Sequence, residues 1–180
     1  AVIFLFSFLP VMLKVFNGNR EPNHFGTLMY GLMGLASGAG LLIALRALNI
    51  SGGAFANAIV FDNFVVVAGI FICFAGMAGL ILAYDHISTN SHQFAEFVFL
   101  YLSAIFGMGV LISANDLMVM FIGIETMSLC LYILVAMSRE ATLSKEAAFK
   151  YFILGSFASA IFLYGVALVY GTCGSTYLPK

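Results

Sequence analysis

The chain has 180 residues, of which 63% are apolar and 8% are charged, and its mean hydropathy is +1.09. Soluble domains carry about 45–50% apolar and about 25% charged residues, so this composition excludes a water-soluble globular domain and indicates a protein embedded in membrane lipid. Seven Lys and Arg nearly balance eight Asp and Glu. This balance excludes the strongly basic surface that nucleic-acid binding requires, so no nucleic-acid partner is expected.

Six apolar segments follow one another along the chain. A spanning helix needs about 20 mostly apolar residues, at about 1.5 Å of rise per residue across about 30 Å of hydrocarbon. The first segment is short, and the other five are long enough to span; in order they cover residues 1–16, 27–48, 63–84, 94–113, 117–137 and 144–171. No connection between them is large enough to fold alone. The sequence therefore predicts an all-α, polytopic transmembrane bundle of about six helices, forming one domain over residues 1–180.

The basic residues predict how this bundle is oriented. The first, third and fifth connections share one side of the membrane and hold four basic residues at or beside them, which are Lys14, Arg20, Arg139 and Lys145. The opposite side holds Arg46 and Lys180. Cytoplasmic-type loops carry an excess of Lys and Arg, so the three connections are expected on the positive-inside face, with both termini outside.

Pairs of small residues four apart predict close packing between helices. Such pairs occur at Gly34 and Gly38, at Ala75 and Gly79, and at Gly155 and Ser159. Small side chains allow two helix backbones to approach closely in lipid.

Cofactor motifs are missing from the sequence. Cys73, Cys130 and Cys173 have no CxxC spacing and are interpreted as small core residues rather than a metal or disulfide site. The sequence also lacks a cysteine cluster for iron–sulfur and a buried His pair for haem, so no cofactor and no metal are expected on this chain. It has neither a Walker A loop nor an HExxH motif, which argues against nucleotide binding and metal-dependent hydrolysis.

Glu125 is the most costly charge in the sequence. It lies eight residues into the predicted fifth helix, about 12 Å deep and therefore near the middle of the bilayer. A carboxylate at that depth costs about 2.5–3.5 kcal/mol, so it normally faces the bundle interior with a partner or becomes protonated. Glu125 is either an inert, hydrogen-bonded carboxylic acid that pairs two helices, or a proton or ion relay site, and we favour the relay.

Lys150 is the second candidate. It lies six residues after Ser144, the expected N-cap of the sixth helix, between Phe149 and Tyr151. A lysine this near a helix end can extend its ammonium to the interface. Lys145 already occupies that interface, which favours a functional role for Lys150 inside the bundle.

The other acidic residues have simpler interpretations. Asp62 and Asp116 directly precede predicted helices, where a carboxylate is favoured by the exposed N–H groups and the helix dipole. Glu96 is expected as an interfacial cap of the fourth helix. His24 lies in a connection and is expected to be solvated.

Two runs of residues carry a family resemblance. The run Ser113-Ala114-Asn115-Asp116-Leu117-Met118 leads into Gly123-Ile124-Glu125-Thr126-Met127-Ser128-Leu129 and Tyr132; the second run is Ser144-Lys145-Glu146-Ala147-Ala148-Phe149-Lys150-Tyr151-Phe152-Ile153-Leu154-Gly155. Together they resemble subunit 2, called subunit N in bacteria, of respiratory NADH:quinone oxidoreductase, complex I. The resemblance is densest over residues 94–171.

This resemblance implies an antiporter-like subunit of the membrane arm, which takes part in proton translocation coupled to quinone reduction. It implies that Glu125 and Lys150 carry that translocation, and that the other membrane-arm subunits are partners. The chain would be a non-redox subunit of an oxidoreductase, with no electron transfer of its own. The alternatives are a cation/proton antiporter subunit and a scaffold fragment that does not pump.

The chain departs from the family in length. Members of the family usually carry about fourteen helices, whereas this sequence ends after the sixth predicted one. It therefore corresponds to the N-terminal part of the subunit: either a second chain carries the later helices, or this sequence is one part of a longer subunit. The short chain favours the mitochondrial inner membrane, with the bacterial plasma membrane as the alternative.

Overall fold

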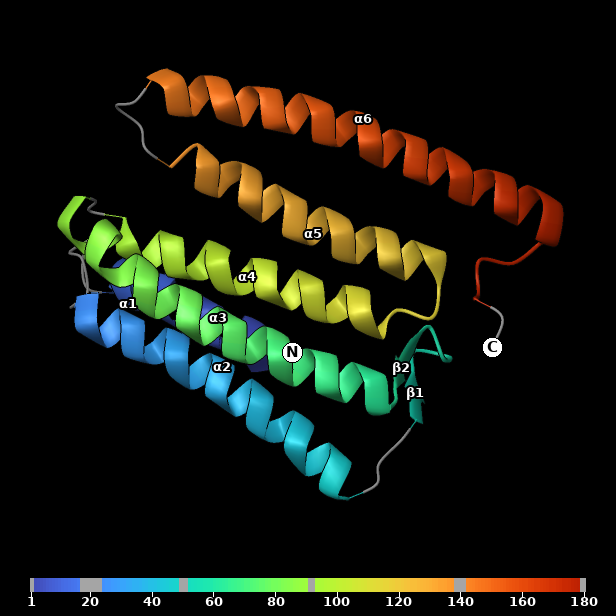
Figure 1. Ribbon diagram of the computed structural model, residues 1–180, viewed down its shortest axis with the longest axis horizontal. Helices are drawn as coiled ribbons and strands as arrows, with labels where there is room; N and C mark the ends of the chain where they lie inside the picture. Colours follow the sequence, from blue (N-terminus) through green and yellow to red (C-terminus); the bar gives the residue numbers. More distant parts are fainter. Residues whose placement is uncertain (1, 17–23, 49–51, 91–92, 138–141, 179–180) are drawn as a thin grey trace.

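The computed structural model describes residues 2–16, 24–48, 52–90, 93–137 and 142–178. Within these residues the chain forms a row of helices and a small hairpin at one end of the bundle (Figure 1). In chain order the elements are α1 (Val2–Phe16), α2 (His24–Ala47), β1 (Gly52–Ala54), β2 (Ile59–Phe61), α3 (Asn63–Asn90), α4 (Phe94–Ser113), α5 (Leu117–Val135) and α6 (Thr142–Cys173). The predicted all-α bundle of about six helices is confirmed.

Five of these helices are long and apolar enough to cross a membrane, namely α2 to α6, while α1 has 15 residues. The short first segment was therefore predicted correctly. Helix α6 begins at Thr142, two residues before the position expected from the sequence. Ser144 does not cap this helix, because it donates its hydroxyl to the carbonyl of Val135 at the end of α5.

Helix α4 lies at the centre of the bundle and packs against α1, α2, α3 and α5. Buried apolar side chains of α2, α3 and α4 form the core, which consists of Leu28, Leu35, Leu80, Phe94, Val98, Leu102 and Ile105. The predicted packing of small residues is visible on α2. A Cβ added to Gly34 would lie 2.7 Å from the Cβ of Phe6, and one added to Gly38 would lie 2.8 Å from Cγ1 of Ile3. These two glycines therefore let α1 pack closely against α2.

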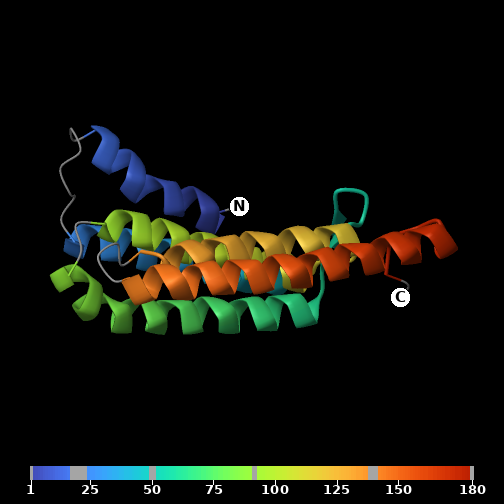
Figure 2. The ribbon, with the colours of Figure 1, turned by 90° about the horizontal axis from the view of Figure 1, so that it is seen from above.

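Helices α5 and α6 extend the bundle on one side of α4 (Figure 1). Seen from above, α1 is tilted away from the other helices, and α6 reaches beyond α5 at the end where the C-terminus lies (Figure 2). Burial falls along this row: 44% of the membrane-spanning stretch of α4 is buried, against 11% of that of α5 and 6% of that of α6. The outer face of α6 is therefore open to lipid or to another helix.

The connection over residues 49–62 contains a feature that was not expected from the sequence. Strands β1 and β2 pair antiparallel, with Gly52 opposite Phe61 and Ala54 opposite Ile59. The turn holds three non-glycine residues with positive φ, at 53° for Phe55, 56° for Ala56 and 69° for Asn57. Such conformations are unfavourable for ordinary side chains, and a lone two-stranded hairpin is marginal. Contacts from other parts of the chain are therefore needed to stabilise it.

Candidate functional site

Glu125 lies near the middle of α5, and its side chain is half-buried. Its carboxylate oxygen Oε1 accepts a hydrogen bond from the hydroxyl of Ser159, which lies on α6. The residue is eight positions from the start of a 19-residue helix, which places it near the middle of α5 as the sequence indicates. The carboxylate has a polar partner on the neighbouring helix, as a charge inside a membrane bundle requires.

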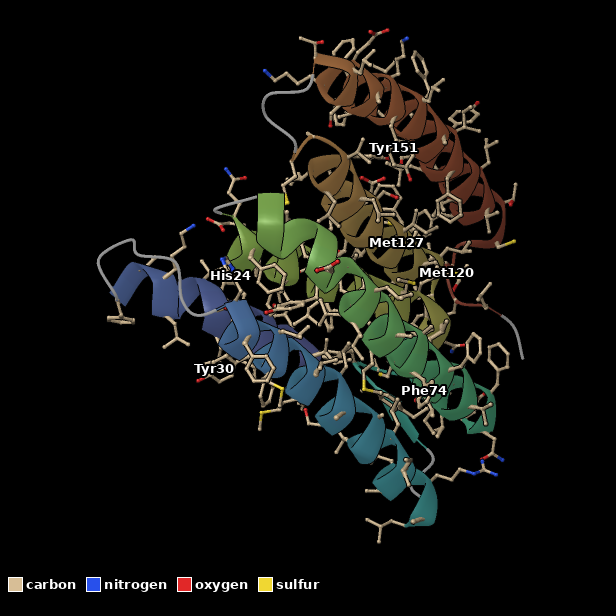
Figure 3. All side chains as sticks on the ribbon, turned by 60° about the vertical axis from the view of Figure 1, so that its left-hand side comes forward. His24, Tyr30, Phe74, Met120, Met127 and Tyr151 are labelled. Carbon is tan, nitrogen blue, oxygen red and sulfur yellow. The ribbon has the colours of Figure 1, made fainter. Side chains whose placement is uncertain are left out.

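Aromatic contacts flank this polar pair along the line where α5 and α6 meet. Towards one end of the helices, the rings of Phe121 and Phe162 stack with centroids 6.3 Å apart. Towards the other end, Tyr132 meets Tyr151 edge to face at 4.8 Å, and Figure 3 shows Tyr151 on the side of α6 that faces α5. The Tyr132 hydroxyl also occupies the position where a side chain at Gly155 would lie. These ring contacts pack α5 against α6 on both sides of the pair.

A direct backbone contact sets the position of Glu125 relative to α4. A Cβ added to Gly107 of α4 would lie 2.7 Å from the backbone nitrogen of Met127. A Cβ added to Gly123 of α5 would lie 2.8 Å from the backbone nitrogen of Leu111. Gly123 precedes Glu125 by two residues, so this contact with α4 lies at the level of the carboxylate but on a different face of α5.

Lys150, the second predicted site residue, does not meet Glu125. Its side chain is exposed, and its ammonium pairs with the carboxylate of Glu146 one turn earlier on α6. Lys150 precedes Ser159 by nine residues, which corresponds to about 14 Å along the helix axis. The structure thus places Glu125 next to Ser159. Lys150 also lies on α6, but nearer the start of that helix.

Sequence reasoning missed Ser159 as a member of the site. The residue had been noted only as half of the small pair with Gly155. That spacing correctly indicated a close approach of α6 to another helix, since Gly155 lies against Tyr132 of α5. The signal that could have identified Ser159 is a hydroxyl at the centre of a closely packed face, opposite a buried carboxylate.

The simpler interpretations of the acidic residues are mostly confirmed. Asp116 caps α5 by accepting a 2.7 Å hydrogen bond from the backbone N–H of Met118, and Asp62 accepts a 2.9 Å bond from Val65 at the start of α3. Glu96 differs from the expectation, because it forms a 2.6 Å ion pair with Lys14 of α1. His24 also differs: its ring packs edge to face on Phe94 at 5.5 Å.

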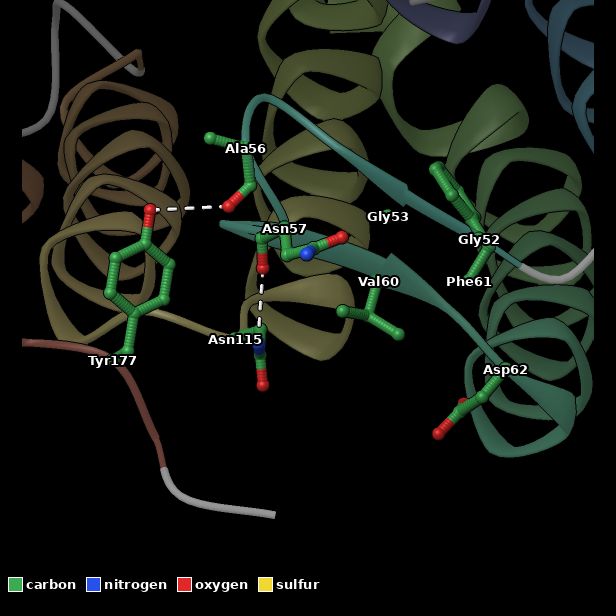
Figure 4. Close-up of a pocket in the computed structure, with 9 residues that line it drawn as sticks. All are labelled: Gly52, Gly53, Ala56, Asn57, Val60, Phe61, Asp62, Asn115 and Tyr177. Carbon is green, nitrogen blue, oxygen red and sulfur yellow. Dashed lines mark hydrogen bonds between the residues drawn. The ribbon is translucent and has the colours of Figure 1, made fainter.

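A pocket of about 780 Å³ lies beside the hairpin, at the end of the bundle opposite the start of α6 (Figure 1). It is lined by hairpin residues together with Asp62, Asn115 and Tyr177 (Figure 4). Several of its polar groups are already used to hold the hairpin. Asn115 donates through Nδ2 to the carbonyl of Asn57 at 3.0 Å, and the Tyr177 hydroxyl donates to the carbonyl of Ala56 at 3.3 Å. These contacts explain how the strained turn is stabilised.

The residues that the structure describes contain no group of three or more His, Cys, Asp or Glu side chains that could hold a metal ion. The site at Glu125 therefore consists of a carboxylate, a hydroxyl and surrounding rings. Such a set can bind and release a proton, because a carboxyl group and a hydroxyl can each donate or accept a hydrogen bond.

Known sequences resemble the chain along most of its length. The family model described as "NADH:quinone oxidoreductase/Mrp antiporter, TM" matches residues 114–180, which include α5 and α6. The chain is 47% identical over 174 residues to NADH-quinone oxidoreductase subunit N of Bdellovibrio bacteriovorus, covering 97% of this chain and 35% of that protein. It is 37% identical over 185 residues to subunit N 1 of Herpetosiphon aurantiacus, covering 100% of this chain and 35% of that protein. The chain thus spans about a third of the length of these relatives.

Solved structures share the fold. A chain of respiratory complex I from Thermus thermophilus with bound aureothin matches with a TM-score of 0.81 at 29% identity, over 99% of this chain and 38% of that chain. A chain of the membrane-bound sulfane sulfur reductase, an archaeal respiratory membrane complex, matches with a TM-score of 0.77 at 18% identity, over 97% of this chain and 37% of that chain. The second likeness concerns the fold alone.

Proposed function

Because the chain belongs to the family of NADH-quinone oxidoreductase N subunits, we propose that it takes part in proton translocation coupled to quinone reduction in the membrane arm of complex I. One observation carries this proposal: Glu125 lies half-buried at mid-span, held by Ser159 between apolar rings. A carboxylate in such a place is costly in free energy, and an ionisable group of this kind is a candidate functional site.

Glu125 and Lys150 interact through the electric field rather than by contact. Two unit charges separated by the rise between Lys150 and Ser159, about 14 Å along α6, interact by about 1 kcal/mol at an effective dielectric constant of 20. The exposure of Lys150 and its pairing with Glu146 reduce this interaction further. Binding of a proton at Glu125 removes a negative charge and so changes the electric field at Lys150. The proposed role of this chain is therefore electrostatic and non-redox, with electron transfer carried out elsewhere in the complex.

The proposed partners are the other membrane-arm subunits. The relatives are named as subunits of NADH-quinone oxidoreductase, and large apolar side chains cover the open face of α6, among them Leu154, Phe157 and Ile161 at 68–72% exposure. We propose that the later helices of the same subunit pack on this face, together with membrane lipid.

The proposed location is an energy-converting membrane that the chain crosses several times. The mitochondrial inner membrane was favoured by chain length alone. Subunit N relatives from Bdellovibrio bacteriovorus, Maricaulis maris and Rhodospirillum rubrum favour the bacterial plasma membrane, which was the alternative.

Replacing Glu125 tests the proposal. In membrane vesicles that contain the assembled complex with the full subunit, Glu125→Gln is expected to lower NADH-driven proton pumping by about tenfold, because an amide cannot bind the proton. Pumping is measured by quenching of a pH-sensitive dye, and assembly by activity staining of a native gel. Thr126→Val is the matched control, since the Thr126 hydroxyl bonds only to the carbonyl of Ile122 in its own helix. A normal ratio of protons pumped to NADH oxidised in Glu125→Gln would contradict the proposal.

Two alternatives predict different results. A cation/proton antiporter subunit requires transport that depends on sodium, whereas the proposed function does not. A non-pumping scaffold requires that Glu125 and Lys150 each be replaceable by apolar residues while pumping is retained.

A further inference from the structure

The hydroxyl of Ser159 behaves differently from other hydroxyls in the described helices. Most of those with a printed partner bond to a carbonyl three or four residues earlier in their own helix: Ser7 to Phe4, Ser37 to Gly34, Ser113 to Gly109, Thr126 to Ile122, Ser156 to Phe152 and Thr172 to Leu168. This local bond is the usual arrangement for Ser and Thr inside a helix. Ser159 instead donates across to Oε1 of Glu125 on α5. Its hydroxyl is aimed at the carboxylate rather than at its own backbone.

The packing around Ser159 makes this orientation possible. Gly155 lies one turn before Ser159 and faces Tyr132, so α6 lies close to α5 at this level. Phe162 lies about one turn after Ser159 and stacks on Phe121. Ser159 thus lies between these two contacts and faces α5, and it is small enough to leave the helices close together.

A hydroxyl suits a carboxyl group that changes its protonation state. An ionised carboxylate can only accept hydrogen bonds, and Ser159 then donates to it. When a proton binds to Oε1, the new O–H group can donate, and the hydroxyl oxygen of Ser159 can accept. The hydrogen bond reverses its direction while the two side chains keep their places.

We propose that Ser159 is a positioning residue that holds the carboxyl group of Glu125 against α6 in both of its protonation states. This proposal rests on the proposed function, because it assigns Glu125 a protonation cycle. Without the hydroxyl, the carboxyl group is free to turn away from α6, and the proton-binding position is no longer fixed relative to Lys150.

The test compares three serine variants of the full subunit in the assembled complex. Ser159→Ala removes the hydroxyl and is expected to lower NADH-driven proton pumping by about three- to tenfold, the size expected when one hydrogen bond is lost. Ser159→Thr keeps the hydroxyl and is expected to restore at least half of the pumping. Ser156→Ala is the matched control, because Ser156 lies on the same helix and bonds only to the carbonyl of Phe152. It is expected to pump as the unaltered protein does.

A double variant separates positioning from packing. If Ser159 acts through Glu125, Ser159→Ala lowers pumping no further once Glu125→Gln is present. An additional loss of pumping in the double variant would overturn the proposal, and so would equal losses in Ser159→Ala and Ser159→Thr at full assembly. Unaltered pumping in Ser159→Ala, together with a loss in Glu125→Gln, would overturn the role of Ser159 and leave the proposed function standing. Unaltered pumping in Glu125→Gln would overturn both.

Discussion

Two ion pairs in this protein show how the position of a charged residue determines its contribution to stability. Lys14 of α1 and Glu96 of α4 join helices that are distant in the sequence, and their side chains are 14% and 40% exposed. Lys150 and Glu146 lie one turn apart on α6, with 68% and 57% exposure. Partly buried pairs between elements contribute more than exposed pairs within one helix, because solvent screens the exposed pair.

Replacing the acid of each pair by its amide tests this difference. Glu96→Gln removes the charge of the carboxylate that joins α4 to the poorly exposed ammonium of Lys14, and it is expected to cost about 1–3 kcal/mol of stability. Glu146→Gln is the matched control and is expected to cost less than about 0.5 kcal/mol. The temperature at which the complex disappears from a native gel measures both effects. Equal shifts for the two variants would contradict this ranking.

Single residues also set the limit of what the sequence could predict. Glu125 could be recognised as a candidate site residue because a carboxylate in the middle of an apolar helix is costly in free energy, whatever surrounds it. The bond from Ser159 could not be recognised, because serine inside a helix usually bonds to its own backbone. The partner of Glu96 could not be predicted either, because its contact with Lys14 depends on how α1 is placed beside α4.

At the scale of elements, the position of α5 depends on backbone contact with α4. The glycines at 107 and 123 bring main-chain atoms of the two helices together, so a side chain at either position has no flexible neighbour that can move aside. The helices themselves could be predicted from hydropathy, since each is a long apolar run. The hairpin could not, because Phe55 and Ala56 are residues that rarely adopt positive φ, and their conformation depends on distant contacts.

Adding one methyl group to α4 tests the importance of this contact. Gly107→Ala is expected to separate α4 from α5, to cost about 1–3 kcal/mol through overpacking, and to lower pumping by displacing Glu125. Gly109→Ala is the matched control, since nothing lies within 4 Å of a Cβ added at that position. Thermal stability in detergent and NADH-driven pumping report the two effects. Stability and pumping equal to those of the control variant would show that the contact is not needed.

At the scale of the whole molecule, the helices differ in burial far more than in composition. The membrane-spanning stretches of α4 and α6 have similar mean hydropathies of 2.0 and 2.2, yet 44% of that stretch is buried in α4 and 6% in α6. Hydropathy predicts that a helix lies in the membrane, but it does not predict which neighbours surround it. For this reason the sequence predicted the number of helices and not the central place of α4.

The open face of α6 leads to a prediction about assembly. After extraction in mild detergent, the chain is expected in the band of a native gel that stains for NADH dehydrogenase activity. Mass spectrometry of that band is expected to find peptides from the later helices of the subunit beside those of this chain. Migration of the chain alone, or together with transporters outside the respiratory chain, would contradict membership of the assembled complex.

Bonds at both ends of the α5–α6 pair determine how α6 can move. At one end, Ser144 bonds to Val135. At the other end, Thr176, just beyond α6, donates to Asp116 at 2.6 Å, and its carbonyl accepts from Leu117 at 2.9 Å. A helix that is held at both ends cannot slide along its neighbour, and a force on it bends it most near its middle. Ser159, the partner of Glu125, lies near the middle of α6, so bending of this helix acts on the hydrogen bond that holds the proposed proton-binding carboxylate.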